Sequence, residues 1–219
     1  IMNLHRYLAD WDAASDKPFA PVQKEARSEK VGIIGAGPAG LTCAYFLAIE
    51  GYQVTVFEKL PVLGGMLTVG IPSYRLPRDI IEAEIQVIRE LGVQFKTGVD
   101  IGKDLTIGEL RQQGYQAFFV AIGAQECIPL NIEGEDWEGV YPGLDYLCQV
   151  NLGEPVALGK NVAVIGGGNV AVDAVRSARR LGAENAFIIY RRGLAEMPAR
   201  AEEIDECQEE GISIHTLTQ

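Results

Sequence analysis

The chain has 219 residues, enough to bury one large core or two smaller ones. Its net charge of −11 leaves no overall positive field for nucleic acid or an anionic membrane surface, and we expect neither as a partner. No apolar run reaches the roughly 18 residues of a membrane-spanning helix, and the N-terminal residues do not resemble a signal peptide, so we expect a cytoplasmic protein.

The first 29 residues predict a helix and a linker. Apolar residues from Leu4 to Trp11 recur at helical spacing, which indicates a short amphipathic helix over residues 2–14. Residues 15–30 are polar and contain Pro18 and Pro21, which is typical of a linker. We therefore expect the first folded domain to start close to residue 30.

A strand, a glycine-rich turn, a helix and a second strand follow in that order. Residues 31–34 are apolar and lead into Gly-Ala-Gly-Pro-Ala-Gly at residues 35–40, after which apolar residues recur at helical spacing as far as Ile49. Residues 54–57 form a second β-rich run, closed by Glu58. This order predicts a βαβ unit with parallel strands.

The middle of the chain predicts one helix and two strands. Residues 78–91 have helical periodicity, and residues 93–96 and 117–122 read as strands, the second of which ends at Gly123. The opening pattern then returns: a strand at residues 161–165, a glycine turn at residues 166–171, a helix through Leu181 and a strand at residues 186–190. A second βαβ unit is therefore expected.

The glycines of the first turn match the roles that a dinucleotide-binding turn requires. Gly35 allows the tight turn, Gly37 lets the backbone approach a pyrophosphate, and Gly40 lets helix and strand pack closely. Pro38 preorganises the first turn of a helix whose N-terminus attracts phosphate. Glu58 stands about 20 residues on, where a carboxylate accepts hydrogen bonds from a ribose; the alternative is a solvated acid at a strand end.

These residues resemble a known superfamily. The first turn, Glu58 and the later pair Gly64 and Gly65 are similar to the extended fingerprint of FAD-binding flavoproteins with two dinucleotide domains. Residues 64–77, GGMLTVGIPSYRLP, resemble the GGML-x-x-GIP-x-x-RLP signature of the glutamate synthase small (beta) subunit family. Residues 120–124 are similar to the superfamily's ATG strand, with Ile122 in place of Thr, and residues 190–199 also resemble this family.

The resemblance implies an α/β fold in which a Rossmann-like FAD-binding domain is followed by an incomplete Rossmann-like NAD(P)-binding domain. We expect residues 1–29 to be a helix and linker that leave a missing iron–sulfur domain. Residues 30–148 would form the FAD-binding domain without its C-terminal part, and residues 149–219 part of the NAD(P)-binding domain. On this interpretation the chain is a fragment of a longer protein.

The resemblance and the turns together give a set of candidate cofactor-binding residues and no catalytic or metal-binding side chain. For FAD the candidates are Gly35, Gly37, Pro38, Ala39, Gly40, Glu58, Lys59, Gly64, Gly65, Met66, Leu67, Gly70, Ile71, Val99, Ala121 and Gly123. For the nicotinamide nucleotide they are Gly166, Gly168, Asn169, Val170, Arg191 and Arg192. The segment of residues 64–77 is expected beside the flavin, the alternative being a surface connection.

NADPH is the expected nicotinamide cofactor, with NADH as the alternative. An NAD-selective unit ends its second strand in a carboxylate, whereas here Tyr190 is followed by Arg191 and Arg192, which suit a 2′-phosphate. The two arginines could instead be a solvated strand end, or pair with Glu196 and nearby acids.

The implied reaction passes hydride from NADPH to FAD, and electrons then continue to [4Fe–4S] clusters outside this chain. The expected partners are an iron–sulfur domain or subunit and a large catalytic subunit, and the final acceptor stays open. A thioredoxin-reductase-type enzyme would need a vicinal cysteine pair, whereas Cys43, Cys127, Cys148 and Cys207 are scattered. The alternative from another class is a nucleotide-binding sensor or assembly module without turnover.

Overall fold

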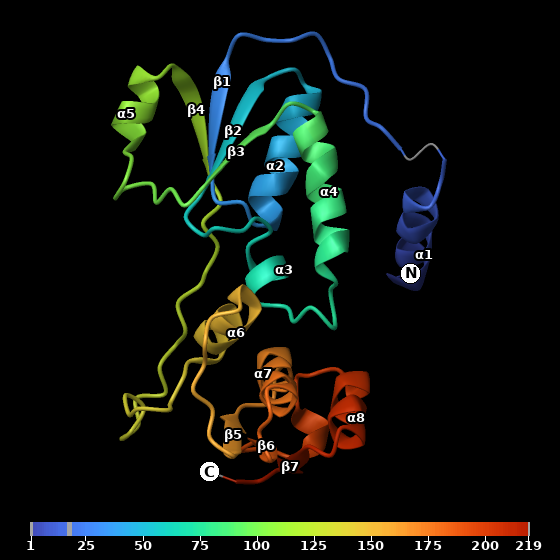
Figure 1. Cartoon of the computed structure of the whole chain (residues 1–219), viewed down its shortest axis with the longest axis vertical. Helices are drawn as coiled ribbons and strands as arrows, with labels where there is room; N and C mark the ends of the chain where they lie inside the picture. The colour runs from blue at the N-terminus through green and yellow to red at the C-terminus, as the bar shows by residue number, and fades with distance from the viewer. Residues whose placement is uncertain (1, 17–18, 219) are drawn as a thin grey trace. The chain divides into compact units, whose positions relative to one another are not determined.

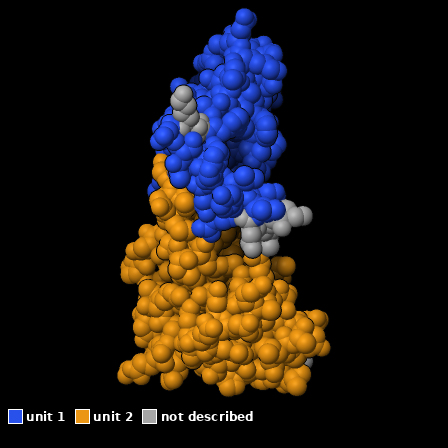
Figure 2. All heavy atoms as spheres, turned by 90° about the vertical axis from the view of Figure 1, so that its right-hand side faces the viewer, with its two compact units in different colours: residues 1–61, 83–121 blue, residues 62–82, 122–219 orange. Residues whose placement is uncertain are grey.

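The computed structural model describes residues 2–16 and 19–218 of the chain (Figure 1). The chain divides into two compact units, one of residues 1–61 and 83–121 and the other of residues 62–82 and 122–219 (Figure 2). This division differs from the expected boundary at residue 148, because residues 62–82 and 122–148 pack with the second unit. The compact units reflect which residues pack together, whereas the expected limits concern which residues bind each cofactor. The expected domain limits therefore stay a prediction.

The N-terminal helix α1 covers Met2–Ala13, one residue fewer than expected. Its apolar side chains Leu4, Tyr7, Leu8 and Trp11 are all more than half exposed. In the linker that follows, the described residues carry neither helix nor strand before Lys30, and Pro18 lies outside the described residues.

The first unit contains a parallel sheet of four strands in the order β3-β2-β1-β4. The strands are β1 (Lys30–Ile34), β2 (Gln53–Glu58), β3 (Gln94–Thr97) and β4 (Tyr115–Val120). Helix α2 (Pro38–Ile49) connects β1 to β2 and buries Leu41 together with three small residues, Gly40, Ala44 and Ala48, which allow close packing against its neighbours. The predicted parallel βαβ unit is confirmed, with Ile34 opposite Phe57.

Two more helices are built on different local signals. Helix α4 (Arg78–Glu90) buries Ile81, Ile85 and Ile88, which recur at helical spacing, and it confirms the expected helix. Helix α5 (Ile107–Gln112) was not predicted. It begins with a complete capping box between Thr106 and Glu109.

The second unit contains a parallel sheet of three strands in the order β5-β6-β7. The strands are β5 (Asn161–Ile165), β6 (Asn185–Ile189) and β7 (Ser213–His215), and Ile165 lies opposite Ile189. The unit's helices are α3 (Met66–Val69), α6 (Gly143–Leu152), α7 (Asn169–Arg180) and α8 (Ala201–Glu209), with a 3₁₀ turn at Leu194–Glu196.

Helix α7 forms the centre of the second core. Val172, Val175 and Ala178 are fully buried in one cluster with Ile188 of β6 and Cys207 of α8. The second predicted βαβ unit and the α/β class are thus confirmed. Across residues 2–16 and 19–218, no helix combines the length and apolar character that crossing a bilayer requires.

Candidate dinucleotide-binding sites

The first glycine turn has the backbone geometry that its sequence predicts. Gly35 has a φ of +102°, which favours glycine, and its N–H donates to the carbonyl oxygen of Phe57 at 2.8 Å. Gly37 is the N-cap of α2, and no side chain caps this helix end. The first-turn amides of α2 therefore lack the side-chain oxygen that usually satisfies one of them.

Gly37 and Gly40 need glycine for different reasons. Gly37 has φ −75° and ψ −178°, a conformation open to any residue, so the backbone itself does not require glycine there. At Gly40 a Cβ atom would collide with the carbonyl oxygen of Gly35 and would lie 3.3 Å from Cγ2 of Ile33. Gly40 therefore serves close packing of helix and strand, whereas the backbone conformation of Gly37 places no such demand.

Glu58 lies at this turn rather than in solvent. Its residue is only 6% exposed, and its Oε2 accepts a 2.8 Å hydrogen bond from the N–H of Ala36, inside the turn. Its Oε1 accepts another of 2.8 Å from Leu60. The alternative of a solvated acid at the strand end is therefore wrong. Each carboxylate oxygen keeps lone-pair capacity for a further donor such as a ribose hydroxyl.

Several other candidates lie next to this carboxylate and turn. The N–H of Val99 donates to the carbonyl oxygen of Glu58 at 3.0 Å, and the N–H of Ala121 donates to that of Ile34 at 2.7 Å. Pro38, Ala39 and Lys59 are exposed. The first unit thus brings its candidate residues from four segments to one end of the sheet.

The second glycine turn repeats the first. Gly166 has a φ of +140°, and its N–H donates to the carbonyl oxygen of Ile189 at 3.0 Å, as that of Gly35 does to Phe57. Gly168 is the N-cap of α7, with φ −93° and no side-chain cap. A Cβ on Gly168 would make only an ordinary contact of 3.9 Å with Pro198. Glycine at position 168, like that at 37, is not required by its own backbone.

The repetition also aligns the ends of the two second strands. Since Ile189 corresponds to Phe57, Tyr190 occupies the position of Glu58, and the second turn has no carboxylate there. The Tyr190 ring instead covers Gly167, where a Cβ would lie 2.6 Å from Cε2 of the ring. The Tyr190 hydroxyl donates to the carbonyl oxygen of Glu196 at 2.8 Å. The missing acid is evident in the sequence, whereas the packing of the Tyr190 ring on Gly167 was not predicted from it.

Arg191 and Arg192 follow Tyr190 and are exposed. Within residues 2–16 and 19–218 neither arginine forms an ion pair, and the carboxylate of Glu196 accepts instead from the N–H of Gly193 at 2.7 Å. The alternative in which both arginines pair with nearby acids is not the arrangement in the structure. Asn169 and Val170, in the first turn of α7, are exposed as well.

The turns differ at their third small residue. A Cβ at position 40 does not fit, whereas the second turn carries the Cβ of Ala171, which would lie 3.4 Å from a Cβ built on Gly166. The φ of Gly166 is +140° and that of Gly35 is +102°.

The segment of residues 64–77 belongs to the second unit and contains no strand, so it is not a surface hairpin. Gly64 and Gly65 have φ values of +103° and +54° and lead into α3, which carries Met66 and Leu67. The Arg78 guanidinium donates to the carbonyl oxygens of Leu67 at 3.0 Å and Ile71 at 2.8 Å. This segment is thereby held in a defined backbone conformation.

Asn151 of α6 adds to this arrangement. Its Oδ1 accepts from Arg78 at 2.9 Å, and its Nδ2 donates to the carbonyl oxygen of Val69 at 2.9 Å. Gly70 follows α3, and a Cβ there would lie 3.0 Å from the Met66 carbonyl oxygen. Gly123 also belongs to the second unit, has a φ of +71° and faces open space.

The four cysteines lie far apart in the sequence. Cys43, Cys127, Cys148 and Cys207 are not joined in disulfides. Burial raises the pKa of Cys43 and raises that of Cys207 to about 11. Both thiols are therefore held protonated and poorly nucleophilic at neutral pH.

Comparisons with known proteins agree with this geometry. Residues 29–219 match the family described as pyridine nucleotide-disulphide oxidoreductase. The chain belongs to this family. It is 52% identical over 241 residues to the NADP(+)-dependent formate dehydrogenase subunit beta of Moorella thermoacetica, which covers 99% of this chain and 34% of that protein. It is 34% identical over 225 residues to the glutamate synthase [NADPH] small chain of Escherichia coli K12, covering 97% and 47%.

A solved structure shows the same fold. FprA from Mycobacterium tuberculosis in complex with NADPH matches with a TM-score of 0.67 and 25% identity, over 84% of this chain and 48% of FprA. The resemblance to glutamate synthase small subunits is thus confirmed, within a group of oxidoreductase subunits. The chain spans about a third to a half of the length of the two relatives named above.

Proposed function

We propose that the chain is the flavin- and nicotinamide-binding core of an NADPH-dependent oxidoreductase that passes hydride from NADPH to FAD. The observation that carries the proposal is a unit of strand, glycine turn, helix and strand that occurs twice in the chain. Glu58 ends the first unit, and Tyr190, Arg191 and Arg192 end the second. Relatives named for NADP(+) and NADPH, at 52% and 34% identity, support the choice of cofactor.

The first turn fits the FAD role on its own geometry. Gly37 presents a bare backbone at an uncapped helix N-terminus, where the partial positive charge favours a pyrophosphate. The buried Glu58 carboxylate, fixed by Ala36 and Leu60, would accept from the adenosine ribose. Val99 and Ala121 lie against the same end of the sheet, and we assign residues 64–71 to the flavin as well. Bound FAD would accept hydride and release electrons onward.

The second turn would hold NADPH in a corresponding way. Gly168 leaves room at the N-terminus of α7, and the exposed Asn169 and Val170 begin that helix. Arg191 and Arg192 would contact the 2′-phosphate, since a guanidinium can make paired hydrogen bonds to phosphate oxygens. No side chain needs to act as a base, because the cofactors carry the chemistry.

Electron delivery to iron–sulfur clusters of another domain or subunit is part of the proposal. The relatives' names include "subunit beta" and "small chain", which supports a partner chain. We assign residues 30–148 and 149–219 to FAD and NAD(P) binding respectively, as the resemblance implies. Glutamate synthesis is one use of such a module. The final electron acceptor depends on the partner chain with which the module assembles.

The test uses the full-length natural protein under anaerobic conditions. NADPH should bleach the flavin of the wild type. Gly37→Val should abolish flavin binding, whereas Gly168→Val should keep the yellow flavin and lose bleaching by NADPH but not by dithionite. Gly108→Ala on α5, where a Cβ would make only an ordinary contact of 3.8 Å with Thr106, is the control and should behave as the wild type.

Two results would contradict the proposal. A Gly37→Val protein with stoichiometric flavin would overturn the FAD assignment. A wild-type flavin that dithionite reduces and NADPH does not would favour the sensor or assembly module.

A further inference from the structure

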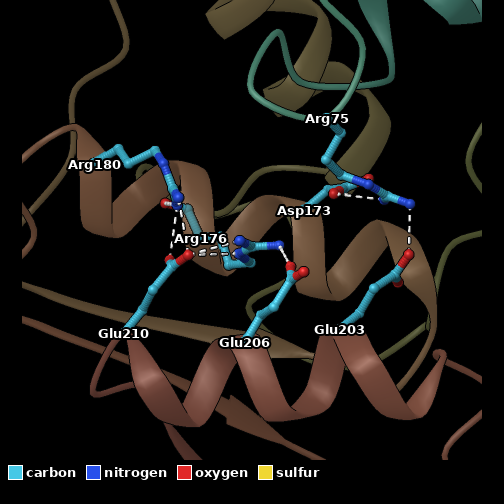
Figure 3. A network of polar contacts seen from close by, with 7 residues as sticks. All are labelled: Arg75, Asp173, Arg176, Arg180, Glu203, Glu206 and Glu210. Carbon is cyan, nitrogen blue, oxygen red and sulfur yellow. Dashed lines mark hydrogen bonds and ion pairs between the residues drawn. The ribbon is translucent and has the colours of Figure 1, made fainter.

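A charged network joins Arg75 to helices α7 and α8 inside the second unit (Figure 3). The Nη1 of Arg75 donates to both carboxylate oxygens of Asp173, at 2.8 and 2.7 Å. Its Nη2 donates to Oε1 of Glu203 at 2.5 Å. One guanidinium therefore bridges two helices from the segment of residues 64–77.

Helix α7 is buried on two faces of opposite character. One face carries Val172, Val175 and Ala178 and packs in the apolar core. The other carries Asp173, Arg176 and Arg180, at the i, i+3 and i+7 spacing of one helical stripe. Asp173 is 5% and Arg176 6% exposed, so this charged stripe is not a solvated surface.

Tyr74 contacts the positive part of the same stripe. The guanidinium of Arg180 lies 4.0 Å from the centre of the Tyr74 ring, and that of Arg176 lies 4.9 Å from it. Burial and the nearby Asp173 carboxylate raise the pKa of Tyr74 to about 12, so its hydroxyl stays neutral. Two adjacent residues thus complement the charges of α7. The Tyr74 ring lies against the cations Arg176 and Arg180, and the Arg75 guanidinium pairs with the Asp173 carboxylate.

Helix α8 completes the network from its other side. Glu206 accepts from Arg176 at 2.5 Å, and Glu210 accepts from Arg176 at 2.6 Å and from Arg180 at 2.7 Å. Burial raises the pKa of Asp173, and the hydrogen bond and charge of Arg75, together with the charge of Arg176, oppose this rise. Without Arg75, two carboxylates less than a tenth exposed would lose their direct ion-pair partner.

Asp173 places the contact with Arg75 near the start of α7. Asp173 lies in the second turn of α7, the helix whose first turn follows Gly168 and would receive the nucleotide phosphates. The segment that carries Tyr74 and Arg75 is itself held through Arg78 and Asn151. Arg75 therefore links the second turn of α7 to a segment that is itself anchored by hydrogen bonds.

We propose that Tyr74 and Arg75 are positioning residues, which clamp the nucleotide-binding end of α7 to residues 64–77 so that the two respond together. This inference rests on the proposed function, which places NADPH at the start of α7. By linkage, ordering of residues 64–77 then strengthens nucleotide binding, and bound nucleotide orders those residues. The ligand that drives the response is a phosphorylated nicotinamide dinucleotide.

Hydrogen exchange of the full-length flavoprotein, with and without saturating NADP⁺, tests the clamp. NADP⁺ should slow amide exchange both at residues 166–171 and at residues 64–77. In Arg75→Gln the slowing at residues 64–77 should disappear, and the NADP⁺ dissociation constant should rise roughly fivefold or more, the low end of usual coupling. Lys160→Gln removes the same charge from an exposed ion pair with Glu184 and should change neither value.

A second variant separates positioning from folding. The double variant Arg75→Gln, Asp173→Asn removes both charges of one buried pair, so it should be folded better than the single variant and still lack the response of residues 64–77. A purely structural role would lower stability and leave that NADP⁺ response intact in folded protein, which would overturn the clamp. Absence of slowing at residues 166–171 in the wild type would instead overturn the nucleotide assignment, and the clamp with it.

Discussion

At the scale of single residues, the glycines of the two turns have different physical roles. Gly35 and Gly166 supply a positive φ, and Gly40 supplies the absence of a Cβ next to a backbone carbonyl. Gly37 and Gly168 have ordinary extended conformations, and in the proposed function their lack of a side chain serves the ligand. We therefore expect substitutions to separate positions that determine the fold from positions that bind the ligand.

Gly40→Ala is expected to weaken the fold of the first unit. Its Cβ would collide with the Gly35 carbonyl, and relief requires movement of the turn, at a cost of about 1–3 kcal/mol in the free energy of unfolding. Gly108→Ala is the matched control: within α5 it should stabilise by up to about 1 kcal/mol, because alanine favours a helix. Urea unfolding measures both, and equal effects of the two substitutions would contradict the packing argument.

Replacing Arg191 and Arg192 together with alanine should reduce selectivity for NADPH. The two side chains are exposed, and neither joins an ion pair with another described residue, so their removal leaves no carboxylate unpaired. Loss of a charge-assisted contact costs roughly 1.5–3 kcal/mol, so kcat/KM for NADPH should fall tenfold or more. The value for NADH should change little, and equal losses for the two cofactors would show that the arginines do not contact the 2′-phosphate.

At the scale of elements, the sequence predicted those that carry their own signal. The apolar runs before the glycine turns gave β1 and β5, and helical periodicity gave α2, α4 and α7 within about one residue. Helix α5 was missed although Thr106 and Glu109 form a capping box, because Leu110 is its one buried residue and so gives no apolar period. The sequence could not reveal that the acids of α8 face arginines about 30 residues away.

The contact between α7 and α8 should make stability sensitive to acid. Hydrogen bonds from Arg180 and Arg176 lower the pKa of Glu210 from 4.5 to about 2. The folded state therefore binds the proton less readily than the unfolded state, and stability present above about pH 5 is lost as the pH falls toward 2. Glu210→Gln should cost about 1–2 kcal/mol at neutral pH and flatten this dependence.

The control for the acid-sensitive contact is Glu209→Gln. Glu209 is exposed, and no ion pair among the described residues includes it, so this substitution removes the same charge without the α7 contact. Urea unfolding from about pH 7 to pH 3 compares the variants. An unchanged slope in Glu210→Gln would show that other carboxylates govern the acid response.

At the scale of the whole molecule, the candidate site was predicted unevenly. The turn residues and Glu58 follow from spacing, since a βαβ unit brings them to one sheet end. The roles of Tyr190 at the second turn and of Arg75 on α7 depend on contacts distant in sequence, and no local pattern predicts such contacts. The spacing of residues in the sequence likewise does not predict that residues 62–82 pack with the second unit.

The family name includes disulphide chemistry, and a dithiol mechanism would need two cysteines that can pair beside the flavin. None of the four cysteines of this chain is in a disulfide, and burial raises the pKa of Cys43 and Cys207. We therefore expect a full-length variant with Cys43, Cys127, Cys148 and Cys207 replaced by alanine to transfer hydride from NADPH to flavin normally. Anaerobic stopped-flow bleaching should change less than about twofold, equivalent to roughly 0.4 kcal/mol in the barrier. Since Cys207 is buried in the second core, flavin content and urea unfolding must be measured alongside. A large loss of rate in a folded, flavin-loaded variant would place a thiol of this chain in the reaction and restore the disulfide-reductase alternative.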